Sequence, residues 1–404
     1  MKLGSQFIVG LALAASCPLA SAALPEVTKS PGPGQYGTVN AALTVATNGD
    51  TVEIIDNSLP FVEQVIIQNK NNFILRGKAG LSPQPTIQGT GTASPFDAGL
   101  KVAFSYNNAV DNLLVQDLII KAGTGDDVVC DARFWNGATF TNVTFDATGA
   151  NNALRSQVAS TFNSCTFLNG MYQIEHYFGG PIVFHGCTMT GATGTWGFYI
   201  RGGSATFDQD CFLSAKNSAA TIAIEPGASD WGDPSISLTK CIVTHEDTTE
   251  HKLIMIWNGN TNETQMRRLN ADQCDFVGQW ATTARGIEVD SGVRNGGTQL
   301  SIQNSIWWNA FVQVYQIAAD KVTPAAFEDY NVFKEAPAGL DPYYTAGPHD
   351  TVNLAPADLL YVSPPTDYRV FSDSVAATMK TGATPYSGSK GVGPHSAVDF
   401  WPLY

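Results

Sequence analysis

The sequence predicts an all-β chain that folds as a solenoid of parallel strands, and two observations support this prediction. The first is a short phrase that returns between Val128 and Phe333, as in Phe162-Asn-Ser-Cys165-Thr-Phe167 and Phe184-His-Gly-Cys187-Thr-Met189. The second is the alternation of apolar and polar residues within each copy, which is typical of strands and not of helices. Such repeats stack, because no single unit can bury its own apolar face.

The spacing between copies of this repeated motif indicates how many residues form each coil. Equivalent positions lie 22 to 33 residues apart. Short strands at a period near 22 residues correspond to one coil per repeat. The longer repeats leave room for loops, which we expect at 226–233, 245–251 and 258–268.

Composition bounds the class of protein. The 404 residues are 44% hydrophobic and only 14% charged, so the chain can bury a long core, and we predict one elongated, monomeric domain. The formal net charge is −14. Nucleic acid is therefore not an expected partner, because phosphate-backbone binding needs clustered Lys and Arg.

The first 22 residues are predicted to be a signal peptide. Lys2 precedes an apolar run at 7–15, and Ala20-Ser-Ala22 fits the small-residue pattern before a cleavage site. We expect a secreted, periplasmic or cell-surface protein that starts near Ala23. A lipid anchor at Cys17 is the alternative. No segment is long and apolar enough to be predicted as a transmembrane helix.

The elements follow in order after a lead that contains Pro and Gly. Residues 38–46 have helical apolar spacing, with Thr38 as N-cap, and predict a short capping helix. Residues 51–55 alternate as a strand, and the coils continue to Phe333. From 334 to 404 frequent prolines predict a loop-rich C-terminal cap.

The entrance to the coils resembles a known superfamily. The segments 38–46, Gly49-Asp-Thr-Val-Glu-Ile54, Phe73-Ile-Leu-Arg-Gly77 and Pro85-Thr-Ile-Gln-Gly89 are similar to the start of pectin-lyase-like right-handed parallel β-helix proteins. With the repeats, the resemblance covers about 38–333 and implies a right-handed coil. It implies no single activity, since the superfamily includes lyases, hydrolases, esterases, epimerases and non-catalytic surface proteins.

Six cysteines remain after the predicted cleavage, and five hold the same place in successive coils. We expect these five to form one inward column with neighbours about 4.8 Å apart. They are either buried thiols that act as small apolar fillers or disulfides between adjacent coils. Their spacing matches no metal-binding signature. The six are Cys130, Cys165, Cys187, Cys211, Cys241 and Cys274.

A second strand of each coil carries the candidate site. Aligning its central apolar residues places one outward column of charged and aromatic side chains along the solenoid. Arginines can hold carboxylates or sulfates, carboxylates accept sugar hydroxyls, and rings stack on sugars, so a polysaccharide is the expected partner. With Tyr199 on the neighbouring outward column, the predicted residues are Arg133, Arg155, Glu175, Arg201, Glu225, Trp257, Asp290 and Tyr315.

Three functions fit this column. A uronate lyase, which the resemblance favours slightly, would use His176 beside Glu175 as base or acid, with Arg155 and Arg201 as a clamp. An inverting glycoside hydrolase would use the carboxylates of Glu175 and Glu225. A non-catalytic, adhesive surface protein would use the same column as an ion-pair ladder. The characteristic motifs of pectate lyases, polygalacturonases and pectin methylesterases are missing.

No cofactor or metal is assigned from the sequence. Three groups could bind calcium or a transition metal, namely Asp126-Asp127, Asp208 with Asp210, and His245-Glu-Asp247 with Glu250-His251. Short acidic runs on an acidic surface are more often solvated loops.

Overall fold

The computed structural model describes residues 24–334 with short gaps, together with 351–354, 361–363 and 367–370. The predicted signal peptide, Cys17 and most of the predicted C-terminal cap lie outside the described residues. The gaps are 98, 107–110, 134–136, 217–218, 229, 247–250, 259–263, 279–284, 291, 294, 309–311, 316–321, 324–327 and 330.

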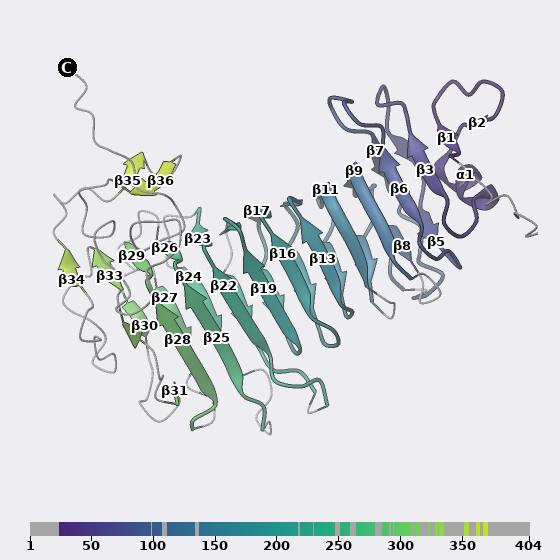
Figure 1. The fold of residues 1–404 in the computed structure, drawn as a ribbon. Coiled ribbons are helices and arrows are strands. Elements are labelled where there is room, and N and C mark those ends of the chain that lie inside the picture. The colour runs from purple at the N-terminus through teal and green to yellow at the C-terminus, as the bar shows by residue number, and fades with distance from the viewer. Residues whose placement is uncertain are drawn as a thin grey trace, which may run out of the picture.

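The strands of successive coils stack along the molecule (Figure 1). One face is a ten-stranded parallel sheet in which each strand pairs with its equivalent in the next coil. Its strands are β5 (Val65–Ile67), β8 (Val102–Tyr106), β10 (Val128–Ala132), β12 (Asn152–Ser156), β15 (Tyr172–His176), β18 (Trp196–Ile200), β21 (Ala220–Ile224), β24 (Lys252–Ile256), β27 (Arg285–Val289) and β30 (Val312–Tyr315).

A second sheet contains two further parallel ladders that meet at a corner. The first ladder is β3 (Thr51–Ile54), β6 (Ile74–Gly77), β9 (Leu113–Lys121), β11 (Ala138–Asp146), β13 (Ser160–Asn163), β16 (Ile182–His185), β19 (Ser204–Asp208), β22 (Ser235–Thr239), β25 (Arg267–Asp272) and β28 (Thr298–Gln303). The other is β4 (Phe61–Val62), β7 (Thr86–Gln88), β9, β11, β14 (Thr166–Leu168), β17 (Thr188–Ala192), β20 (Phe212–Ala215), β23 (Ile242–His245), β26 (Asp275–Gly278), β29 (Ile306–Trp308), β33 (Val332–Lys334) and β34 (Thr351–Leu354).

Short strands complete the described elements. β1 (Glu26–Val27) pairs with β2 (Gln35–Tyr36) and β3, and β31 (Val322–Thr323) and β32 (Glu328–Asp329) pair with β28. β35 (Tyr361–Ser363) and β36 (Asp367–Val370) form a separate antiparallel pair.

Because parallel strands joined by crossovers coil right-handedly, the chain is a right-handed parallel β-helix, and the predicted fold class is confirmed. Among the described residues, no helix is both long and apolar enough to cross a bilayer.

The N-terminal end is covered by α1 (Val39–Val45), as predicted. The Thr38 side chain accepts a hydrogen bond from the N–H of Ala41, and the Glu63 carboxylate accepts from the N–H groups of Val39 and Asn40 at 2.8 and 2.9 Å. The helix buries Val39, Ala42 and Leu43. It therefore covers apolar residues that the first coil would otherwise expose.

Left-handed backbone directly before the cysteine position makes the corner between the two ladders, at one residue in most coils and at Gln209 and Asp210 in one coil. In most coils the corner residue is not glycine, although the left-handed backbone conformation is energetically unfavourable for a residue with a side chain. It always comes directly before the position that the cysteines occupy. The residues, with φ from 52° to 66°, are Asp117, Asn142, Ser164, Gly186, Asp210, Lys240, Gln273 and Asn304.

The cysteine position has a hydrogen-bonding role at this corner. The N–H of Cys165 donates to the sulfur of Cys187 at 3.4 Å, and the N–H of Cys187 donates to the sulfur of Cys211 at 3.2 Å. Further along, the N–H of Cys274 donates in the same way to the hydroxyl of Ser305 at 3.2 Å. A buried N–H needs a partner. In the coils that carry Cys187, Cys211 and Ser305, the side chain at this position therefore also accepts a hydrogen bond, which the apolar-filler interpretation missed.

The described cysteines are all buried and none forms a disulfide. Beside them, phenylalanines stack from coil to coil. The rings of Phe162 and Phe184 lie 5.1 Å apart between centroids, and those of Phe184 and Phe207 lie 4.6 Å apart. Each such pair contributes roughly 0.5–1.5 kcal/mol beyond its burial. Stacking and corner hydrogen bonds together hold adjacent coils in register.

The corner contact predicts different outcomes for two substitutions of Cys187. Cys187→Ser keeps an acceptor for the N–H of Cys165, so its free energy of unfolding should stay within about 1 kcal/mol of the wild type. Cys187→Ala leaves that buried N–H without an acceptor and should lose about 1–3 kcal/mol. Urea unfolding of both variants measures the difference. Equal losses would show that the sulfur only fills space.

Candidate functional site

The outer face of the ten-stranded sheet carries two columns of side chains, most of them polar or aromatic, two residues apart along each strand. Strand register defines the first, and backbone hydrogen bonds that continue past the strand ends define the second. The first column is Asp131, Arg155, Glu175, Tyr199, Ala223, Met255, Glu288 and Tyr315. The second contains Arg133, Tyr177, Arg201, Glu225, Trp257 and Asp290.

The single column predicted from the sequence is therefore wrong. Glu175 lies beside Tyr199, not Arg201, because the register pairs Ile174 with Phe198 and His176 with Ile200. The sequence alignment matched the apolar Ile174 to Ile200. A polar residue inside the core interrupted the apolar pattern, and the alignment slipped by two positions.

His176 is that core residue. Its side chain has no exposed surface, and neither ring nitrogen has a hydrogen-bond partner within the part of the chain that the structure describes. Burial lowers the pKa of His176 from 6.5 to about 4. A polymer on the outer face cannot reach this imidazole, so the catalytic role predicted for it is wrong.

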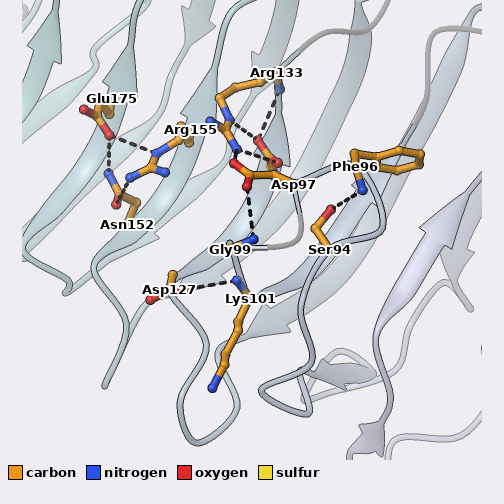
Figure 2. A network of polar contacts seen from close by, with 11 residues as sticks. Ser94, Phe96, Asp97, Gly99, Lys101, Asp127, Arg133, Asn152, Arg155 and Glu175 are labelled. Carbon is orange, nitrogen blue, oxygen red and sulfur yellow. Dashed lines mark hydrogen bonds and ion pairs between the residues drawn. The ribbon is translucent and has the colours of Figure 1, made fainter.

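At the N-terminal end of the face, a hairpin is tied to the sheet through Arg133 (Figure 2). The hairpin closes with an antiparallel bridge between Ala93 and Lys101. Its Asp97 accepts a hydrogen bond from Arg133 at 3.0 Å, and Asp131 accepts another at 2.8 Å. The bond from Arg133 holds the pKa of Asp97 below its ordinary value. Arg133 thus bridges two carboxylates.

The next coils carry a second network around Glu175 (Figure 2). Its carboxylate accepts hydrogen bonds from Arg155 at 3.0 Å and from the Asn152 amide at 3.2 Å. Burial, followed by the adjacent Glu175 carboxylate, raises the pKa of Tyr177. The phenol therefore stays protonated. Glu175 is held by two donors, and only 7% of its surface is exposed.

A third network joins Glu225 to an arginine and two rings. The Tyr199 hydroxyl donates to the Glu225 carboxylate, and an Arg201 nitrogen lies 3.9 Å from the other carboxylate oxygen. The guanidinium of Arg201 also lies 5.4 Å from the ring centroid of Trp231. Burial and then Glu225 raise the pKa of Tyr199, so this phenol is a hydrogen-bond donor and not a base.

Aromatic side chains surround this third network on the outer face. The ring centroid of Trp196 lies 4.4 Å from that of Tyr199, 5.0 Å from that of Trp257 and 6.2 Å from that of Tyr172. Trp196 is 6% exposed, while Tyr172, Trp257 and Met255 are half-buried. We call these five residues the aromatic cluster. It is separate from the core inside the coils.

The remaining predicted residues lie toward the C-terminal end. Asp290 accepts a hydrogen bond from the N–H of Gly292 at 2.6 Å, which is a turn contact. The backbone of Tyr315 pairs with Glu288, but its side chain lies outside the described residues. Within the described part of the chain, no three His, Cys, Asp or Glu side chains lie together so as to hold a metal ion.

Several residues and contacts of the outer face were not predicted from the sequence. Asp97 and Arg133 are 36 residues apart, and no pattern connects a hairpin tip to a strand end. Trp196 and Tyr172 occupy matching positions at the start of β18 and β15, where a correct alignment would have placed them together. Trp231 lies in a loop after β21 and reaches back over Tyr177 and Phe178, with ring centroids at 6.0 and 4.9 Å.

Comparison with known proteins supports no family assignment. No family model matches the chain, and no curated protein matches it. A tailspike protein from the Acinetobacter baumannii bacteriophage Fri1, titled a capsular polysaccharide depolymerase, is similar with a TM-score of 0.49 and 10% identity, over 85% of this chain and 66% of that one. The match thus spans just under two thirds of the tailspike chain.

A second similar structure is the pectin methylesterase of Aspergillus niger. It has a TM-score of 0.36 and 15% identity, over 72% of this chain and 84% of the esterase. At such identities a shared fold says nothing about a shared activity.

The buried His176 predicts a pH-dependent stability. Because its pKa is lowered in the folded state, its contribution is complete above pH 6.5 and is lost as pH falls toward 4. The loss is about 3 kcal/mol for a shift of this size. His176→Leu should lack this part of the pH dependence in urea unfolding between pH 7 and 4. Parallel curves for the variant and the wild type would contradict a buried, neutral imidazole.

Proposed function

We propose that this protein binds a polysaccharide along the outer face of the ten-stranded sheet, outside the cell. The observation that carries the proposal is the aromatic cluster next to hydrogen-bonded carboxylates and arginines on consecutive coils. Rings offer a flat apolar surface to sugar rings, and charged groups hydrogen-bond to hydroxyls. Stacked coils repeat such positions, which suits a polymer with repeating units.

The residues expected to carry out a lyase reaction, the activity that the sequence resemblance slightly favoured, do not have the properties that this reaction needs. β-Elimination needs a base next to the substrate and a cation to stabilise the developing charge. His176 is buried, and the raised pKa values of Tyr177 and Tyr199 make both phenols weak candidates for a base. The arginines expected to form the clamp already bind carboxylates of this chain.

Glycoside hydrolysis is the second candidate, because two carboxylates remain on the face. Glu175 and Glu225 are two coils and two residues apart, so their backbones are about 12 Å apart. Their side chains would have to lean toward each other to bring the carboxyl groups to the roughly 6.5–9.5 Å of inverting enzymes. Tyr199 lies beside Glu175 on the next strand and donates to Glu225.

Binding is tested with variants of the aromatic cluster. Trp257→Ala and Tyr172→Ala should each weaken binding to the recognised polysaccharide by about tenfold, as expected when a stacking ring is lost. Val62→Ala removes a side chain that is 61% exposed on β4 and should change nothing. Affinity electrophoresis over a panel of neutral and uronate polysaccharides measures these affinities. Unchanged binding by both cluster variants would refute the proposed surface.

The same panel separates binding from catalysis. New reducing ends without ultraviolet-absorbing unsaturated products would indicate hydrolysis, and Glu175→Gln and Glu225→Gln should then abolish it. Unsaturated products would instead show that the protein cleaves by β-elimination, as a lyase does. Binding with neither product would support the non-catalytic, adhesive function.

A further inference from the structure

Three arginines of the outer face whose side chains the structure describes, Arg133, Arg155 and Arg201, are already paired within this chain. Each has at least one carboxylate partner. The ion pairs are Arg133 with Asp131 at 2.8 Å and with Asp97 at 3.0 Å, Arg155 with Glu175 at 3.0 Å, and Arg201 with Glu225 at 3.9 Å.

A carboxylate from a ligand would have to displace these partners. Asp131 is 1% exposed and Glu175 and Glu225 are each 7% exposed, so a displaced side chain would stay buried without its cation. Removing one partner of a buried ion pair is strongly unfavourable, because the remaining charge is left uncompensated. Competition by an anionic sugar at these arginines is therefore disfavoured.

The electrostatic balance points in the same direction. In the three networks, three guanidinium groups face four carboxylates, so the described polar groups there carry a net negative charge. The whole chain has a formal charge of −14. A polyanion approaching this face meets repulsion over about a Debye length, roughly 8–10 Å at physiological salt.

A neutral sugar polymer meets none of these obstacles. Its hydroxyl groups can donate to the partly exposed carboxylate of Asp97, and its ring faces can lie against the half-buried Tyr172 and Trp257. The paired arginines hold the carboxylates in fixed orientations. This matters because an oriented acceptor loses less side-chain entropy on binding.

We infer that the ligand of the outer face is a neutral polysaccharide, one whose units carry no carboxylate, sulfate or phosphate. The inference rests on the proposed function and narrows the substrate class that the sequence suggested, a uronate-containing glycan. The inference makes Glu175 a determinant of specificity. Its carboxylate is paired with Arg155, the arginine that a uronate carboxylate would otherwise bind.

The first test compares the same polymers with and without their charges. Polygalacturonate, alginate and polyglucuronate are each used in native form and after chemical reduction of their carboxyl groups to alcohols. At least one reduced polymer should bind the wild-type protein tenfold or more tightly than its native form. Tighter binding of the native forms would overturn the inference alone. No binding to any of these six polymers or to neutral glucan, mannan, galactan and xylan would refute the proposed function itself.

The second test releases one arginine. Glu175→Gln keeps the shape and a hydrogen-bond acceptor but removes the charge that neutralises Arg155, so binding to the native uronate polymers should rise about tenfold at low salt and fall again with added salt. Glu26→Gln is the matched control, since it changes the formal charge equally at the N-terminal end, where Glu26 accepts from Gln35. Equal gains in both variants, or no gain in Glu175→Gln, would overturn the inference.

Discussion

The register between coils is the constraint on which the rest of the molecule depends. Parallel ladders fix the spacing of adjacent strands, but each coil must also turn a corner at which one N–H leaves the ladder. In several coils a side chain of the next coil accepts that N–H, as the sulfurs of Cys187 and Cys211 do for Cys165 and Cys187. Corner hydrogen bonds and stacked phenylalanines thus hold each coil against the next. The columns of side chains on the outer face follow from this register.

The fold could be predicted from the sequence because repetition is visible without a structure. The recurring corner phrase, the strand alternation and the capping helix at 38–46 all report local requirements, and local requirements leave local patterns. The hydrogen-bonding reason for the cysteines was not visible in the pattern. Ser305 could have indicated this role, since a serine in the cysteine position also accepts a hydrogen bond from the N–H of the preceding coil.

The site was only partly predictable. Arg155, Glu175, Tyr199 and Glu225 do lie on one face, as alternation requires. Their neighbours were misassigned, because the polar Ser156 and His176 occupy positions where the alignment expected an apolar residue. Contacts that join distant segments, such as the one between Asp97 and Arg133, depend on the path of a loop, and residue periodicity contains no information about that path.

The outer face combines features that are usually considered separately. Its charges satisfy one another, which limits what they can do for a charged ligand, while its rings remain partly open. Tyr199 belongs to both groups, since it packs against Trp196 and donates to Glu225. The hydrogen bonds from Arg133 to Asp131 and Asp97, and from Arg155 to Glu175, make these side chains rigid. Such a surface recognises a ligand through shape and hydroxyl hydrogen bonds more than through charge.

The most direct test of this account is hydroxyl-radical footprinting of the protein with and without the polysaccharide it binds. The account predicts that bound polymer protects the side chains of Tyr172, Met255 and Trp257 from oxidation, while Tyr36 and Leu59 at the N-terminal end react as before. Protection of the N-terminal residues, or of the other two ladders without the ten-stranded sheet, would contradict it.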